Sequence, residues 1–198
     1  MLQTLPEHPT KIRSSPALRV VTLCWLFSAL IAGETGALHE LPMPVVQGIL
    51  LLLTLMILAA FRSWPTFREW VLNCDPRILI SFHLSRFVGI YFLFLYSQAA
   101  LPYGFAMLAG YGDIIIASTA LLLLCMPSQK KSFGSMLTIW NVCGLFEIVV
   151  VLISAARIEF ANPDSMRAWS ALPLSILPTF VLPLLIASHL FLLLRRGR

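Results

Sequence analysis

The sequence predicts an all-α membrane protein built as one bundle of six transmembrane helices. First, 59% of its 198 residues are hydrophobic and only 12% are charged, whereas soluble domains average roughly 45–50% and about 25%. Second, the apolar residues fall in long runs, and a helix needs about 20 such residues to cross a bilayer core about 30 Å thick. Little chain lies outside these runs. We therefore expect a single membrane domain over residues 17–198 and a polar tail over residues 1–16.

Six stretches are long enough, or nearly long enough, to span a membrane. In chain order they are Ala17–Ala37, Pro44–Phe61, Ile78–Ala99, Tyr103–Met126, Ser135–Ala156 and Trp169–Leu194. The third and fourth are joined by the short link Leu101-Pro102, so we expect them to be antiparallel neighbours. The first stretch has the basic start and apolar middle of a signal peptide. Its polar lead is long for a signal, so we expect it to be retained as a helix.

Two of the expected helices contain helix-weakening residues. In the fourth, Gly110 and Gly112 come just before Asp113. Because glycine weakens a helix by about 1 kcal/mol relative to alanine, the chain could unwind there, as in the broken helices of transporters. Close helix packing through the small residues Ala106 and Gly110 is the favoured alternative. The sixth stretch contains Pro173, Pro178 and Pro183. These prolines predict kinks that are either structural or open a cavity.

The basic residues predict that both chain termini are cytoplasmic, because Lys and Arg in short loops favour that side. With the N-terminus inside, eleven of the fourteen Lys and Arg lie on the inner side and only Arg157 and Arg167 lie outside. The remaining cation, Arg86, is within a span. The inner cations are spread over five segments and do not form the basic patch of a nucleic-acid-binding protein. The expected partner is therefore the lipid bilayer, with no role for nucleic acid.

Three charged residues, Arg86, Asp113 and Glu147, lie inside the expected spans. A charge at membrane depth is costly, so it usually faces the bundle interior, is paired and is functional. At a rise of about 1.5 Å per residue, Arg86 is roughly 12 Å from the inner edge and the two acids are about 15 Å from the outer edge. We expect an ion pair between Arg86 and Asp113, with one carboxylate left over that could hold a proton. Asn141, on the same side of its helix as Glu147, could complete this network.

Such a site suits a small transporter for an ion or a proton-linked solute. Arg86 would be the counter-charge, Asp113 and Glu147 the proton or cation carriers, and Asn141 a positioning residue. The alternative is structural: the same charges would only fix helix pairing in a membrane scaffold or assembly protein. The sequence does not identify the solute.

Two histidines suggest a different class of function. His83 and His189 each lie five residues from the inner end of a span, so both are about 7 Å deep. Facing histidines at one depth could ligate the iron of haem b or another metal, in a haem- or quinone-linked redox protein. Hydrogen bonding between helices is the favoured interpretation. No nucleophile elbow, phosphate loop, His-Glu-x-x-His or Cys-x-x-Cys occurs, which favours a protein that is not an enzyme.

Four runs of sequence resemble a known pattern. They are Arg86 to Leu93, Leu101 to Asp113, Trp140 to Glu147, and Pro178 to His189. All are similar to runs found in a family of uncharacterised six-helix bacterial inner-membrane proteins, and they cover about the last two thirds of the chain. In that family an aspartate is common where this chain has Glu147. The resemblance implies a bacterial inner (cytoplasmic) membrane and implies no activity.

Overall fold

The computed structural model describes residues 15–41, 43–127 and 129–196, and it is helical throughout. The predicted polar tail, 1–16, lies almost wholly outside the described residues. Six helical segments of the described chain are long and apolar enough to cross a membrane. They confirm the predicted all-α, multi-pass membrane fold. The spans are α1 (Pro16–Glu34), α2 (Met43–Ser63), the segment Pro76–Ser97, α6 (Tyr103–Cys125), α7 (Phe133–Ala161) and the segment Leu177–Arg195.

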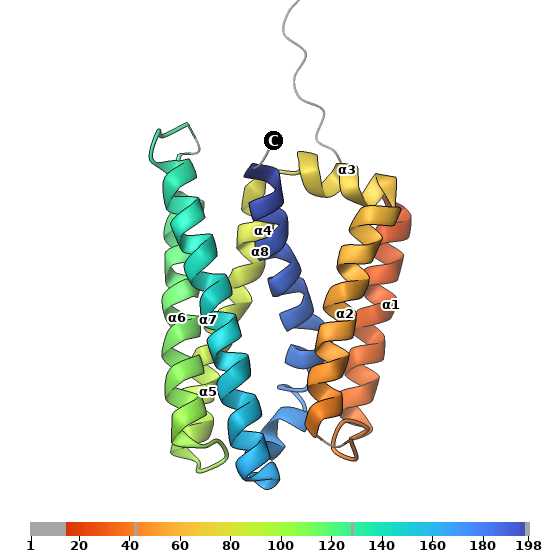
Figure 1. Cartoon of the computed structure of the whole chain (residues 1–198), viewed down its shortest axis with the longest axis vertical. Coiled ribbons are helices and arrows are strands. Elements are labelled where there is room, and N and C mark those ends of the chain that lie inside the picture. Colours follow the sequence, from red (N-terminus) through yellow and green to blue (C-terminus); the bar gives the residue numbers. More distant parts are fainter. Residues whose placement is uncertain (1–14, 42, 128, 197–198) are drawn as a thin grey trace, which may run out of the picture.

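The spans run side by side along the long axis of the molecule (Figure 1). The third span, α6 and α7 form one side of the bundle, α1 and α2 form the other, and α8 (Leu182–Arg196) stands between them. The chain enters α1 and leaves α8 at the same end. We call it the α3 end, after α3 (Pro65–Asn73), which lies there. The opposite end is the η2 end, after the 3₁₀ helix η2 (Pro163–Ser170).

α3 lies between the second and third spans, in a stretch that was not among the predicted helices. It forms a short helix across the end of the bundle, beginning at Pro65, because proline is favoured at the first helical position. Arg195 of α8 holds the end of this helix, donating hydrogen bonds to the carbonyl oxygens of Val71 (3.1 Å) and Cys74 (2.6 Å). Asp75 then caps the next helix by accepting from the backbone N–H of Arg77.

The third span is not a uniform α-helix. It consists of α4 (Pro76–Ser81), the 3₁₀ helix η1 (Phe82–Val88) and α5 (Gly89–Ser97). The sixth span begins with a π-helical turn, η3 (Leu177–Val181), before α8. Irregular turns inside helices often mark functional sites. By contrast, α6 is continuous through its glycines, so the structure has the packed form of this helix and not the unwound form.

Two predicted boundaries were wrong. The fifth span extends to Ala161, five residues beyond the predicted end at Ala156, so Glu159 is on a helix and not in a loop. The sixth span begins at Leu177, because the residues around Trp169 form η2 and a short connection instead of a membrane helix. Pro178 lies within the π turn, where the missing proline N–H is accommodated by the wider helix.

Apolar side chains pack in two clusters, one towards each end of the bundle. The cluster near the α3 end includes Leu79, Trp140 and Phe191. The cluster near the η2 end includes Phe92 and Phe105, with Trp169 packed against it. Outside these two clusters lie the buried polar residues of the interior, among them His83, Arg86, Asn141 and His189.

Candidate functional site

Arg86 is the centre of the buried charged group. Its side chain, on η1, is only 1% exposed. Its Nε donates to Oδ1 of Asp113 on α6 at 2.6 Å, and its Nη2 donates to Oε2 of Glu147 on α7. Its Nη1 donates to the carbonyl oxygen of Gly144 at 3.3 Å. The predicted pair of Arg86 and Asp113 is therefore present, and Glu147 shares the same guanidinium, which joins three spans.

Glycine makes room for this arrangement. A Cβ atom at Gly112 would collide with the carboxylate of Glu147. A Cβ atom at Gly144 would lie 2.7 Å from Cε1 of His189. At position 144 the neighbour is a fully buried ring, so glycine allows α7 and α8 to approach as they do. At position 112 glycine leaves room for the carboxylate of Glu147 where it meets Arg86.

The charged group has one cation and two carboxylates, so it carries a net charge of minus one when all three residues are ionised. Oε1 of Glu147 is buried and has no hydrogen-bond partner among the described residues. A cavity of about 20 Å³ adjoins Arg86, Asp113 and Glu147. That volume holds about one water molecule. A free carboxylate oxygen beside such a space is a suitable place to bind a proton or a small cation.

The two histidines lie side by side, with ring centres 4.2 Å apart and an angle of 51° between the rings. Both are 0% exposed. The hydroxyl of Ser188 donates to the carbonyl oxygen of Leu185, so its oxygen accepts from Nε2 of His83 at 2.9 Å. This network leaves Nδ1 of His83 and Nε2 of His189 without partners among the described residues. The favoured interpretation, hydrogen bonding between helices, fits this geometry.

The spacing of the two rings supports the predicted haem role less well than it supports hydrogen bonding between helices. Two imidazoles that bind one metal at about 2.0–2.1 Å from opposite sides have ring centres roughly 6 Å apart. The 4.2 Å spacing is shorter, so iron binding would require the rings to separate. Within the described part of the chain, no three His, Cys, Asp or Glu side chains are grouped to hold a metal ion. The haem and quinone roles stay predictions.

The hydrogen bonds of Asn141 go to His189 and not, within the described residues, to the charged group that it was predicted to complete. Its amide nitrogen donates to the carbonyl oxygen of His189 at 3.0 Å, and its Oδ1 lies 2.7 Å from Nδ1 of His189. Asn141 therefore positions the histidine and not the ion pair. The charged group and the histidines meet at Gly144, which accepts from Arg86 and packs against His189.

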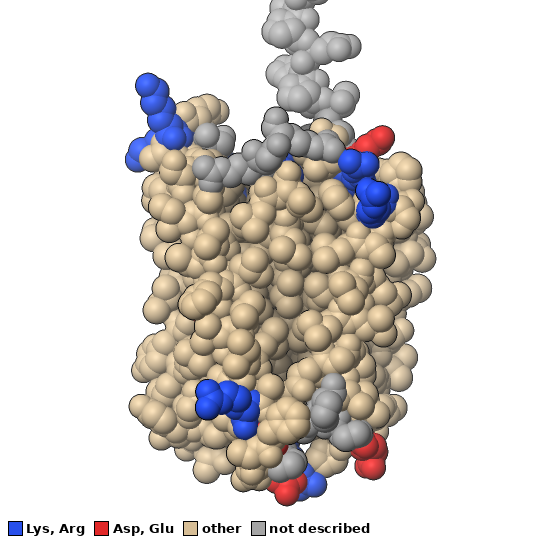
Figure 2. Space-filling model, viewed as in Figure 1, with Lys and Arg blue, Asp and Glu red and all other residues tan. Residues whose placement is uncertain are grey.

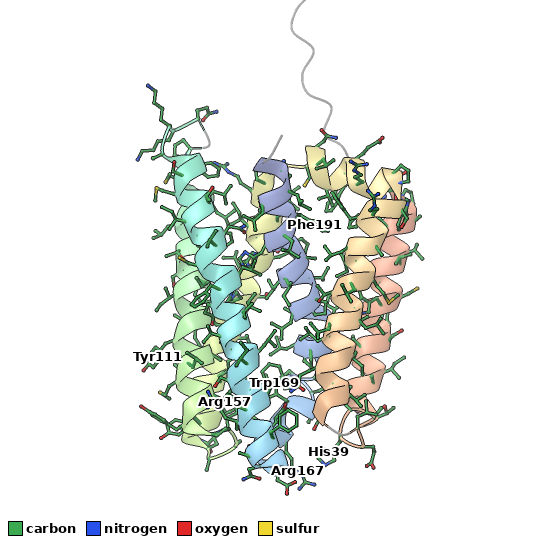
Figure 3. All side chains as sticks on the ribbon, in the orientation of Figure 1. His39, Tyr111, Arg157, Arg167, Trp169 and Phe191 are labelled. Carbon is green, nitrogen blue, oxygen red and sulfur yellow. The ribbon has the colours of Figure 1, made fainter. Side chains whose placement is uncertain are left out.

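A second cavity, of about 200 Å³, opens at the η2 end. Glu159 lines it and accepts a hydrogen bond from the side-chain amide of Gln47. The cavity shares Val151, Leu152 and Trp169 with the small cavity at the charged group. Figure 3 shows Trp169 inside the bundle and Arg167 nearer its rim. A thin apolar wall thus separates the charged group from the η2 end.

Sequence reasoning missed both Glu159 and Trp169 as site residues. A signal for Glu159 was present, because it follows Val151 and Ala155 at four-residue spacing, which places all three on one face of a helix. The early end assigned to the fifth span hid this pattern. For Trp169 no comparable signal exists, since its position depends on the connection between α7 and η3.

Comparison with known proteins gives one match. A search of the curated proteins found none, and neither did a search of the solved structures. Among protein families, residues 43–195 match one described as "Domain of unknown function (DUF8737)". The match begins at α2, so it contains Arg86, Asp113, Glu147 and both buried histidines, and it leaves out α1. Because the match covers more than half of the chain, this protein belongs to the DUF8737 family.

Proposed function

We propose that this protein is a small transporter that couples movement of a solute or ion to protons or another cation. The observation that carries the proposal is the sharing of one buried guanidinium, that of Arg86, between two carboxylates. Ionisable residues inside a membrane bundle are rare and commonly mark ion pathways. A purely structural ion pair would need only one acid.

The second acid gives the charged group a place to bind a proton or a small cation. With both acids ionised, the group has a net negative charge, and Glu147 has a buried oxygen with no partner among the described residues. Binding of one proton or one small cation would neutralise the group. Loss of that charge would weaken the hold of Glu147 on Arg86 and so loosen α7 from η1. Cation occupancy and helix position are coupled in this way.

The two ends of the bundle differ in charge. Within the described residues, the α3 end carries most of the cations outside the core, including Arg62, Arg68, Arg77, Lys130, Lys131 and Arg195. Because Lys and Arg in short loops favour the cytoplasmic side, we infer that this end is cytoplasmic. The cavity at the η2 end is then on the outer side, and the resemblance noted above favours a bacterial inner membrane. Entry from the outer side would lead past Trp169 to the charged group.

The test is transport by purified protein in liposomes. Internal dyes report the collapse of imposed H⁺, Na⁺ or K⁺ gradients in wild type, Asp113→Asn and Glu147→Gln. The expected result is that wild type dissipates at least one gradient faster than empty liposomes do. Each variant should lose most of that activity while keeping the thermal stability of a folded protein. Glu34→Gln is the matched control, because Glu34 is an exposed acid at the end of α1.

Two results would contradict the proposal. In one, wild-type liposomes leak no faster than protein-free ones for all three ions. In the other, activity falls only in proportion to the amount of folded protein, which is the behaviour of a scaffold whose charges fix helix pairing.

A further inference from the structure

An apolar groove is lined by side chains of α1, α2, α3 and α8. It comprises two adjoining cavities of about 280 and 380 Å³. Their linings share five residues, Leu18, Thr22, Ile57, Phe67 and Leu184. Figure 1 shows α8 beside α1 and α2, three of the helices whose side chains line it. We call it the α1–α8 groove.

The groove has the length of one lipid tail. It starts at Phe67 of α3 and follows α8 from Phe191 to Val181. Ten residues at 1.5 Å each give about 15 Å, which is half the thickness of a bilayer core of about 30 Å. Trp25 borders it on the α1 side, where its indole N–H donates to the carbonyl oxygen of Thr179 at 2.8 Å. The groove thus covers one leaflet, from the α3 end to the middle of the membrane.

Three exposed cations lie on the helices that line the groove, near the α3 end. Arg19 follows the lining residue Leu18, and Arg68 follows Phe67. Arg62 is in the last turn of α2. None of the three side chains has an ion pair within the described chain, and the one acid beside them, Glu69, leaves an excess of two positive charges. Figure 2 shows Lys and Arg side chains gathered at this corner. Basic sites at helix ends on the cytoplasmic side bind anionic lipid head groups.

We infer that the α1–α8 groove binds an anionic phospholipid, with one acyl chain along α8 and the phosphate on Arg19, Arg62 and Arg68. The apolar lining matches the chain, and the unpaired arginines match the phosphate. The inner end of the groove is lined by Ser85 and Leu185, which also line the small cavity at the charged group. The tip of the bound chain therefore lies against the wall of that group. This inference does not depend on the proposed transport.

The test is native mass spectrometry of the delipidated protein in detergent, with phosphatidylglycerol or phosphatidylcholine of identical chains added at equal concentration. We expect one retained phosphatidylglycerol and little phosphatidylcholine. A favourable contact of each arginine with an anionic head group corresponds to about a fivefold change in binding. The triple variant R19Q/R62Q/R68Q should therefore lose the preference. Arg157→Gln, an exposed arginine near the opposite end, should keep it.

A second pair of variants tests the chain-binding part. Leu184→Trp fills the groove and should abolish retention, whereas Ile153→Trp, on the exposed face of α7, should leave it unchanged. Thermal unfolding checks that each variant folds, and Ile57→Phe fills the groove from α2 if Leu184→Trp does not fold. Equal retention of the two lipids would mean ordinary annular lipid and would overturn the inference. The inference would also be overturned if Arg157→Gln lost the lipid preference together with the triple variant, or if Ile153→Trp lost retention together with Leu184→Trp.

Discussion

Asn141 and His189 are joined at two points, since the amide nitrogen donates to the histidine's carbonyl oxygen and the amide oxygen faces its Nδ1 at 2.7 Å. The first contact satisfies a backbone carbonyl of α8, and the second fixes the ring in the tautomer that carries its proton on Nδ1. One side chain therefore sets both the position of α8 against α7 and the direction in which the free nitrogen of His189 points.

Replacing Asn141 by leucine should destabilise the protein. The change removes both hydrogen bonds and leaves the Nδ1–H of His189 buried. Hydrogen bonds between membrane helices are worth about 0.6 kcal/mol on average and at most about 1.7 kcal/mol, so we expect a loss of about 1–2 kcal/mol. Reversible unfolding in mixed micelles measures it. Thr119→Val is the control, because Thr119 bonds only within its own helix. An equal effect of both changes would show that Asn141 does not join the helices.

Gly144→Ala should separate α7 from α8. The new methyl group would lie 2.7 Å from Cε1 of His189, a fully buried ring that cannot move freely. We expect destabilisation of about 1–3 kcal/mol, as for overpacked cores. Gly134→Ala on the same helix has open space around it and should be neutral, or stabilising by up to about 1 kcal/mol. Thermal unfolding of both variants in one detergent decides the matter, and equal melting temperatures would contradict the packing described here.

Removing Arg86 alone should lower the free energy of unfolding more than removing all three charges of the group. Arg86→Gln leaves two acids in the bundle without their cation, and breaking a buried pair in this way costs about 3–5 kcal/mol. The triple change R86Q/D113N/E147Q leaves no charge and should recover much of that loss. The yield of folded protein and its unfolding free energy measure both variants. A triple variant no more stable than Arg86→Gln would show that the cost lies in packing and not in charge.

Cys74 should resist thiol reagents at neutral pH. Burial raises the pKa of its thiol, and the nearby Arg195 only partly offsets that effect. The Cys74 thiol of the unfolded chain therefore ionises at a lower pH than that of the folded protein. As a result, the free energy of unfolding is fully kept below pH 9 and falls as the pH rises above 9. A single-cysteine protein with Cys74 should react more slowly than one with the exposed Cys125, and the gap should narrow above pH 9.

The same assay tests the cap on α3. Arg195→Gln removes three hydrogen bonds to this segment, one of them to Sγ of Cys74, and should make Cys74 reactive by exposing it. Arg68→Gln, an exposed arginine on α3 itself, should leave Cys74 protected. If Arg195→Gln also left Cys74 unreactive, the cap would not be what holds the end of α3 in place.

Much of this architecture was predictable because it depends on local sequence. The hydropathy of a segment and the free-energy cost of a charge inside the membrane can both be read from neighbouring residues. Runs of apolar residues predicted all six spans, and the charges within them predicted the pair of Arg86 and Asp113. The partner of Asn141 was not predictable. It depends on the rotation of α7 against α8, which packing sets and no periodicity records. The 3₁₀ turn that carries Arg86 was hidden for a similar reason: no glycine or proline lies within Phe82–Val88, and tertiary contacts impose the irregular backbone.

The hydrogen bond from Trp25 to Thr179 joins residues 154 positions apart. α1 therefore gains this partner only after the segment that contains Thr179 has been made. Until then α1 lies in the lipid, alone or paired with α2. The bundle interior stays open on the side that α1 later covers. Assembly of the complete bundle is consequently a late event in biosynthesis. Nascent chains truncated before residue 177 should insert five helices and still lack the closed interior.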